Sequence, residues 1–193
     1  MDTLNIKVIL ASIRDDRFGD KPAMWITGLA KKIDGISVEL LDLKDYQLPM
    51  FAEKTSPKYV EGSYGNSSVD AWANKITEGD GFIIVTPEYN HGYPSSLKNN
   101  IDYLYKEWVR KTVCFVGYGG TGGARAIQQL CEVAIELQMA PIRDSVHIFN
   151  PWTLVDERGD LKPGVLDNNQ KSAELMLDQL VWWTKALKTA REI

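Results

Sequence analysis

The run Phe82-Ile83-Ile84-Val85 constrains the fold more than any other part of the chain. It is apolar at every position, rich in β-branched residues, and followed at once by the polar and proline-containing stretch that begins with Thr86-Pro87. Strands that are buried on both faces have this pattern, and they occur mainly in parallel sheets with helices on both sides. The run therefore predicts a central parallel strand whose carboxyl end opens into a loop.

Strand patterns recur along the chain, and helical patterns separate them. The expected strands cover residues 6–11, 36–41, 82–85, 111–117 and 142–149. The expected helices cover residues 22–33 and 169–188, a segment capped by Ser67 or Ser68, a segment capped by Ser95 or Ser96 that reaches Trp108, and a segment with Ile127 to Leu137 inward. This alternation predicts an α/β fold, a three-layer sandwich with a five-stranded parallel sheet in the order 2-1-3-4-5.

Length and composition narrow the classes of partner. A chain of 193 residues fits one domain, 1–193, and can bury about 70% of its unfolded surface. The net charge of −4 comes without a basic block, so we expect neither a nucleic-acid nor a membrane partner. Residues 1–7 lack the features of a signal peptide, which favours a cytoplasmic location. Cys114 and Cys131 lie in strand and helix patterns and are expected to be packing residues.

Side chains with binding chemistry follow three of the expected strands. Ser12, Arg14 and Arg17 follow the first strand, and a hydroxyl with two guanidinium groups suits a phosphate. Residues 86–94 follow the third strand and combine aromatic, amide and carboxylate groups, which suit a planar ligand with polar edges. Residues 118–123 follow the fourth strand, and their four glycines indicate positive φ angles or close backbone approach. Because these strands are parallel, the three loops are expected at one edge of the sheet.

The loop after the third strand resembles a known family. Pro87-Glu88-Tyr89-Asn90, then Gly92, Pro94, Leu97-Lys98-Asn99 and Ile101-Asp102, is similar to the signature of the NADPH-dependent FMN reductases. That family has a flavodoxin-like fold and includes azo-, quinone- and chromate-reducing flavoproteins. Residues 42–51 and the glycine-rich residues 119–126 are similar to further segments of the family. Three positions depart from it: Ala11 stands where glycine is usual, and Arg17 and Gly19 stand where many members have serine and asparagine.

The resemblance implies that residues of all three loops bind FMN. These residues are Ser12, Arg14, Arg17, Phe18, Gly19, Pro87, Glu88, Tyr89, Asn90, Gly92, Tyr118, Gly119 and Gly120. It also implies an oxidoreductase that takes NADPH or NADH as reductant and passes reducing equivalents to a small acceptor, such as a quinone, azo compound or flavin, by a ping-pong mechanism. Because the flavin would carry the chemistry, no catalytic side chain is expected, and the two histidines lie too far apart in the sequence to indicate a metal.

Two alternatives to a reductase stay open. The chain could be a flavodoxin-type electron carrier or redox-sensing FMN protein without turnover of its own, or a relative that has lost its flavin. Tyr103, Tyr105, Trp108 and a final helix with apolar residues on two sides predict a homodimer or homotetramer. Trp183 of that helix is expected in the core.

Overall fold

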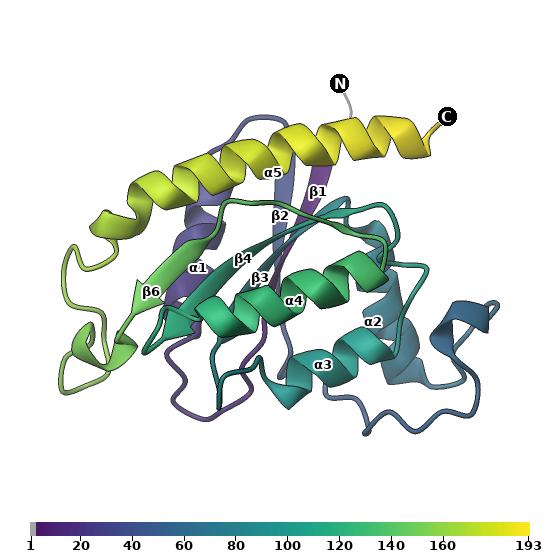
Figure 1. Cartoon of the computed structure of the whole chain (residues 1–193), viewed down its shortest axis with the longest axis horizontal. Helices are drawn as coiled ribbons and strands as arrows, with labels where there is room; N and C mark the ends of the chain where they lie inside the picture. The colour runs from purple at the N-terminus through teal and green to yellow at the C-terminus, as the bar shows by residue number, and fades with distance from the viewer. Residues whose placement is uncertain (1–2) are drawn as a thin grey trace.

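The computed structural model describes residues 3–193 and has three layers (Figure 1). One sheet lies between two sets of helices. The helices α1 (Asp20–Ala30) and α5 (Gln170–Arg191) pack on one face, and α2 (Ser67–Glu78), α3 (Ser95–Asp102) and α4 (Ala124–Glu136) pack on the other. Residues 1 and 2 of the N-terminal stretch considered above lie outside the described residues.

The strands of the sheet pair in parallel and follow the predicted flavodoxin-like order. This order is β2 (Ile36–Asp42), β1 (Leu4–Leu10), β3 (Gly81–Pro87), β4 (Thr112–Gly119) and β5 (Ala140–Pro141), with β6 (Val146–Phe149) also paired to β4. The fifth strand predicted over residues 142–149 is therefore correct only for β6, and the short β5 lies before its predicted start. Pro141 has no N–H to donate to the sheet, and polar residues 143–145 separate β5 from β6.

The central strand β3 carries the core on both of its faces, since all seven of its residues are buried. Ile83 and Val85 pack in the cluster that includes α1 and α5. Phe82 packs in the opposite cluster, where its ring centre lies 5.0 Å from that of Trp108. Each such side chain contributes about 1.5–3 kcal/mol through burial. The packing agrees with the pattern of the sequence.

Two helices begin differently from the prediction. Asn66 caps α2, and its side chain accepts a hydrogen bond from the backbone N–H of Ser68 at 2.9 Å. Asparagine is a strong capping residue, and it stands before the predicted serines. In α3 the capping position is Pro94, and the Ser96 hydroxyl instead donates to the carbonyl of Ala11 at 2.8 Å. That bond connects the start of α3 to the end of β1.

The aromatic residues are distributed differently from the prediction. Helix α3 ends at Asp102, and the turns after it place Tyr103 and Trp108 in the core, where they are 4% and 1% exposed. They cannot supply surface for an oligomer. Trp183 is 39% exposed, because Thr184 occupies the buried stripe of α5 and helical periodicity turns Trp183 away from the sheet.

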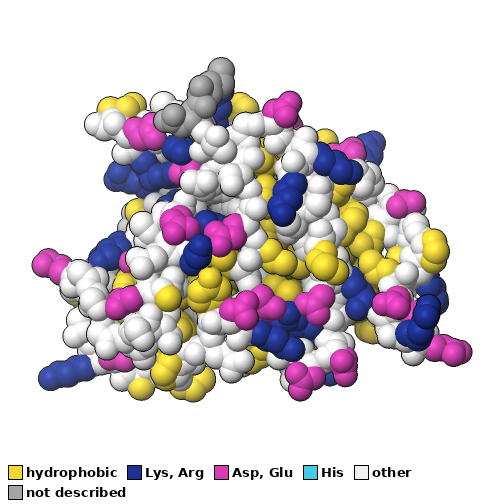
Figure 2. Space-filling model, turned by 180° about the vertical axis from the view of Figure 1, so that it is seen from behind, with side chains coloured by type: hydrophobic (Ala, Val, Ile, Leu, Met, Phe, Trp, Pro, Cys, Tyr) yellow, Lys and Arg dark blue, Asp and Glu magenta, His cyan; other side chains and the backbone are white. Residues whose placement is uncertain are grey.

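The surface mixes charges of both signs. In the view from behind, Lys and Arg side chains alternate with Asp and Glu side chains, and neither sign forms a continuous patch on that face (Figure 2). Across residues 3–193, no helix has both the length and the apolar character that crossing a bilayer requires.

Lys7 is a buried cation near the amino end of the sheet, and its amine contacts the carboxylates of Glu39 and Glu78. Replacing both glutamates with glutamine should cost about 3 kcal/mol at neutral pH, because the buried charge loses its partners. Urea unfolding measures this loss. The matched control is Glu157→Gln, an exposed site that should change stability by less than about 0.5 kcal/mol.

The variant with both glutamates replaced also tests how the stabilisation by Glu39 and Glu78 depends on pH. Hydrogen bonds from Lys7 lower the pKa values of Glu39 and Glu78 below their usual 4.5. Their stabilisation is therefore fully present above that pH and is lost as the pH falls through the lowered values. The difference between wild type and variant should shrink in acid. A difference that stays constant down to pH 3 would contradict this role of the glutamates.

Candidate functional site

The carboxyl ends of β1, β3 and β4 lie level with one another. Val85 pairs with both Leu10 and Val116, and the pairing continues where the backbone N–H of Glu88 donates to the carbonyl of Tyr118 at 3.0 Å. The first loop (residues 11–19), the second loop (88–94) and the third loop (119–123) therefore meet at one edge of the sheet, as the sequence predicts.

A cavity of about 350 Å³ lies at this edge, a size typical of small-molecule sites. Nine of the residues proposed from the sequence line it: Ser12, Arg14, Arg17, Phe18, Pro87, Glu88, Tyr89, Tyr118 and Gly119. Four do not line it: Gly19, Asn90, Gly92 and Gly120. The structure thus brings all three loops to one cavity.

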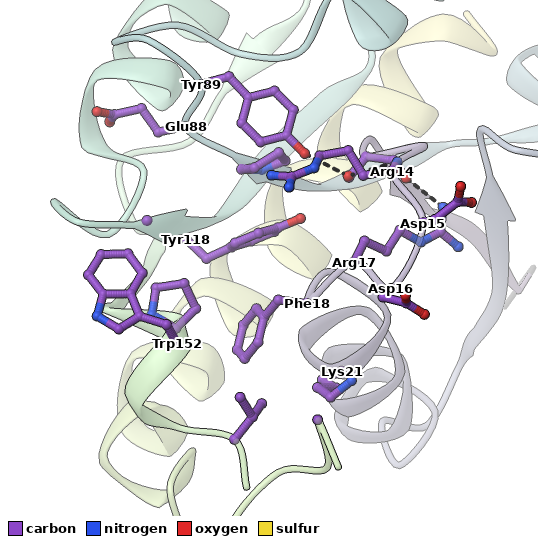
Figure 3. Close-up of a pocket in the computed structure, with 16 residues that line it drawn as sticks. Arg14, Asp15, Asp16, Arg17, Phe18, Lys21, Glu88, Tyr89, Tyr118 and Trp152 are labelled. Atoms are coloured by element: carbon purple, nitrogen blue, oxygen red, sulfur yellow. Dashed lines mark hydrogen bonds between the residues drawn. The ribbon is translucent and has the colours of Figure 1, made fainter. Parts of the chain in front are cut away.

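Aromatic side chains form much of the cavity wall (Figure 3). The rings of Phe18 and Tyr118 lie 5.4 Å apart at an angle of 55°, and Tyr89 and Trp152 lie on other sides of the cavity. Burial raises the pKa of Tyr118, so its side chain is a neutral phenol. Its hydroxyl lies beside Ser12 but forms no hydrogen bond within the described chain. This buried hydroxyl can serve a ligand.

A hydrogen bond connects the first and second loops across the cavity. The hydroxyl groups of Ser12 and Tyr89 lie 2.8 Å apart. The guanidinium carbon of Arg14 lies 5.7 Å from the centre of the Tyr89 ring, and no carboxylate in residues 3–193 pairs with it. The positive charge of Arg14 is therefore available to an anion in the cavity.

Arg17 lines the cavity, but its guanidinium group binds the protein itself. It donates to the carboxylates of Asp20 and Asp42 and to the carbonyl of Ser12. The side chain is 6% exposed. Arg17 thus differs from Arg14, whose charge has no such partner.

The backbone conformation of the second loop accounts for one of the residues outside the cavity. Tyr89 and Gly92 exchange both backbone hydrogen bonds, at 2.8 and 2.9 Å, and enclose Asn90 and His91 in a two-residue turn. Asn90 and His91 have φ angles of 49° and 70°, as the central residues of a type I′ turn do. Asparagine tolerates this conformation well. Asn90 therefore shapes the second loop, and its exposed side chain lies outside the cavity.

The chain's own packing explains most of the glycines near the third loop. A Cβ on Gly123, whose φ is 73°, would lie 2.7 Å from the Cα of Gly117. A Cβ on Gly19 would lie 2.5 Å from the Tyr118 hydroxyl. Gly120 differs, because a Cβ there would meet only the Trp152 ring at 3.7 Å. Packing alone does not require glycine at position 120.

An ion pair holds the second loop against the third. The Glu88 carboxylate is 5% exposed and accepts hydrogen bonds from Arg125 Nε at 2.6 Å, from Arg125 N at 3.1 Å and from the Thr121 hydroxyl at 3.1 Å. Burial opposes the charge of this carboxylate, but the hydrogen bonds from Arg125 lower the pKa of Glu88 below its usual value. Glu88 is therefore a fixed anion at the cavity wall.

Sequence reasoning missed part of the cavity. The additional lining residues are Asp15, Asp16, Lys21, Pro151, Trp152, Val155 and Gly159. Most of them belong to the segment that follows β6, which ends at the same edge as the other strands. The sequence contained a signal for this segment, because the loop after a parallel fifth strand is expected at the same edge of the sheet. Lys21 lies in the first turn of α1, and its amine forms no ion pair within residues 3–193.

Comparisons with known proteins agree with this geometry. A family model described as NADPH-dependent FMN reductase matches residues 4–153. An NAD(P)H-dependent FMN reductase of Schizosaccharomyces pombe is 39% identical over 141 residues, which are 72% of this chain and 70% of the relative. One from a Nectria species is 34% identical and covers 97% of this chain and 96% of its own.

More distant relatives have other names. An NADPH:quinone oxidoreductase of Arabidopsis thaliana is 27% identical and covers 90% of both chains. Among solved structures, the flavoenzyme NAD(P)H:(acceptor) oxidoreductase FerB from Paracoccus denitrificans has a TM-score of 0.67 at 21% identity, and the match covers 97% of this chain and 98% of that one. This structural likeness shows the fold.

Arg125→Ala should destabilise the protein by about 2 kcal/mol, because the buried Glu88 carboxylate loses charged hydrogen bonds. Thermal and urea unfolding measure the change, with Arg143→Ala at a 94% exposed side chain as control. Glu88→Gln added to Arg125→Ala should recover part of the loss, since no buried charge remains. An Arg125→Ala protein as stable as wild type would contradict the assignment.

Proposed function

The chain belongs to the NADPH-dependent FMN reductase family, an oxidoreductase family with FMN as cofactor and NAD(P)H as reductant, and we propose that its cavity binds FMN and that a quinone is its acceptor. The single observation that carries the proposal is the convergence of the first, second and third loops on one cavity with aromatic walls and an unpaired cation. The name of the Arabidopsis relative supports a quinone.

The residues at the cavity fit FMN in size and chemistry. The volume of about 350 Å³ lies in the usual range for small-molecule sites. Ser12 and the unpaired Arg14 would hold the phosphate, together with backbone N–H groups at the start of α1. Tyr89 and Tyr118 offer flat surfaces to a ring system, and the Tyr118 hydroxyl is a buried polar group without a partner in the described chain.

FMN bound here would supply the transfer of reducing equivalents from a nicotinamide to an acceptor. The protein's part is to bind and to orient. Glu88 keeps the second loop in place through Arg125, and the Ser12–Tyr89 bond holds that loop to the first. Reductant and acceptor would occupy the same edge of the sheet in turn, and a ping-pong mechanism follows from that shared position.

We also propose a single domain over residues 1–193 that works in the cytoplasm as a homodimer or homotetramer. The proposed reductant, NAD(P)H, is available in the cytoplasm, which favours that location. Support for an oligomer comes from α5, where Trp182 is 60% exposed and Trp183 is 39% exposed.

Reconstitution and turnover test the function directly. The protein, purified and mixed with FMN, should retain the flavin absorbance after gel filtration. In the absence of oxygen it should oxidise no more than a stoichiometric amount of NADPH or NADH by itself, and should turn over repeatedly only when 1,4-benzoquinone is present. Initial rates at several quinone concentrations should give parallel double-reciprocal lines. FMN binding without nicotinamide oxidation would favour the electron carrier, and absence of FMN binding would indicate a relative without flavin.

Arg14→Gln should weaken FMN binding about tenfold, because one charge-assisted contact to phosphate is worth roughly 1.4 kcal/mol or more. Riboflavin has no phosphate, so its affinity should stay within twofold. Flavin fluorescence titration measures both. Arg143→Gln is the exposed control. An equal loss of FMN and riboflavin affinity would show that Arg14 does not contact the phosphate.

A further inference from the structure

We propose that Arg17 is a positioning residue, which holds the first loop to the end of β2 through Asp42 and so shapes the phosphate site without contacting the phosphate. The inference rests on the proposed FMN site. It assigns a role to the arginine that stands in this chain where many family members have serine.

The hydrogen bonds of Arg17 leave it little capacity for a ligand. A guanidinium group has five N–H donors. Four of them donate within the chain: Nε to Asp20 at 2.8 Å, Nη1 to Asp42 at 2.7 Å and to the Ser12 carbonyl, and Nη2 to the second Asp42 oxygen. Nη2 also lies 2.7 Å from Asp20. A phosphate would have to displace one of these acceptors.

The three acceptors come from three different elements. Ser12 follows β1, Asp42 ends β2, and Asp20 begins α1. One buried side chain therefore fixes the start of the first loop, its end and the neighbouring strand relative to one another. The parallel two-point contact with Asp42 adds geometric precision, because a planar fork meets a planar carboxylate.

Asp42 is itself held in position. Its carboxylate accepts a hydrogen bond from the backbone N–H of Lys44 at 2.9 Å, and its side chain is 24% exposed. Burial disfavours the charge of Asp42, but the hydrogen bonds from Arg17 and Lys44 lower its pKa below the usual value. The carboxylate is therefore charged at neutral pH and keeps Arg17 turned toward β2.

The charges around the first loop agree with this division of roles. Asp20 and Asp42 together more than balance the single charge of Arg17. Arg14 and Lys21 line the cavity without an ion-pair partner in residues 3–193. These two cations, and not Arg17, provide the positive charge for a phosphate.

Asp42→Asn separates the two roles because only the positioning role predicts a loss of the affinity advantage of FMN over riboflavin. If Arg17 positions the loop through Asp42, the variant should lose about tenfold of the affinity advantage of FMN over riboflavin. If Arg17 contacts the phosphate, removing its competing carboxylate should leave this advantage unchanged or larger. The ratio of the two dissociation constants is the readout, since general destabilisation lowers both affinities together.

Two further variants complete the test. Arg17→Lys keeps the charge but not the forked geometry, so it should lose the FMN advantage as Asp42→Asn does, and the double variant should be no worse than either single one. Asp45→Asn, an exposed carboxylate in the same turn, is the matched control. Should Asp42→Asn fold too poorly to be measured, retained discrimination in Arg17→Lys still overturns the inference.

These outcomes are distinct from a failure of the proposed function. Wild-type protein that does not bind FMN at all would refute the FMN site. Wild-type protein that binds FMN, together with an Asp42→Asn variant that discriminates as well or better, would refute only the role of Arg17.

Discussion

The hydrogen-bond pairing of β1, β3 and β4 is the constraint on which the site depends. Val85 stands opposite both Leu10 and Val116, so three chain segments leave the sheet at the same height. A shift of one residue in any strand would turn its side chains to the other face and move its loop away. Side-chain packing opposes such a shift, because Phe82 packs against Trp108 on one side of the sheet and Ile83 packs in the core cluster on the other side.

Once the strands are in register, a few polar bonds set the loops. Ser12 joins the first loop to Tyr89, and Glu88 joins the second loop to the helix that follows the third. Asn99, which belongs to the family signature, also holds a loop in place. The buried Asn99 accepts from the backbone N–H of Phe51 at 2.8 Å and donates to the Pro49 carbonyl at 2.8 Å. Resemblance to a family through such residues reports architecture as well as binding.

The sequence predicted the first four strands, the strand order and the convergence of three loops, because apolar runs and loop chemistry are local signals. It did not predict where single side chains point. Arg17 and Asp42 are 25 residues apart, and only the pairing of β1 with β2 brings them together. Likewise, the exposure of Trp183 becomes clear only when α5 is placed on the sheet, where Thr184 and not Trp183 faces Gly81 of β3. The segment containing Trp152 was missed because it has no motif of its own.

The two ends of the sheet have separate tasks. Lys7 and its glutamates lie at the amino end, and the cavity lies at the carboxyl end. Sequence changes in the loops around the cavity therefore leave the charged anchor of the strands untouched. The loops around the cavity can therefore change in sequence, in evolution or by protein engineering, and alter the preferred substrate while the sheet stays the same.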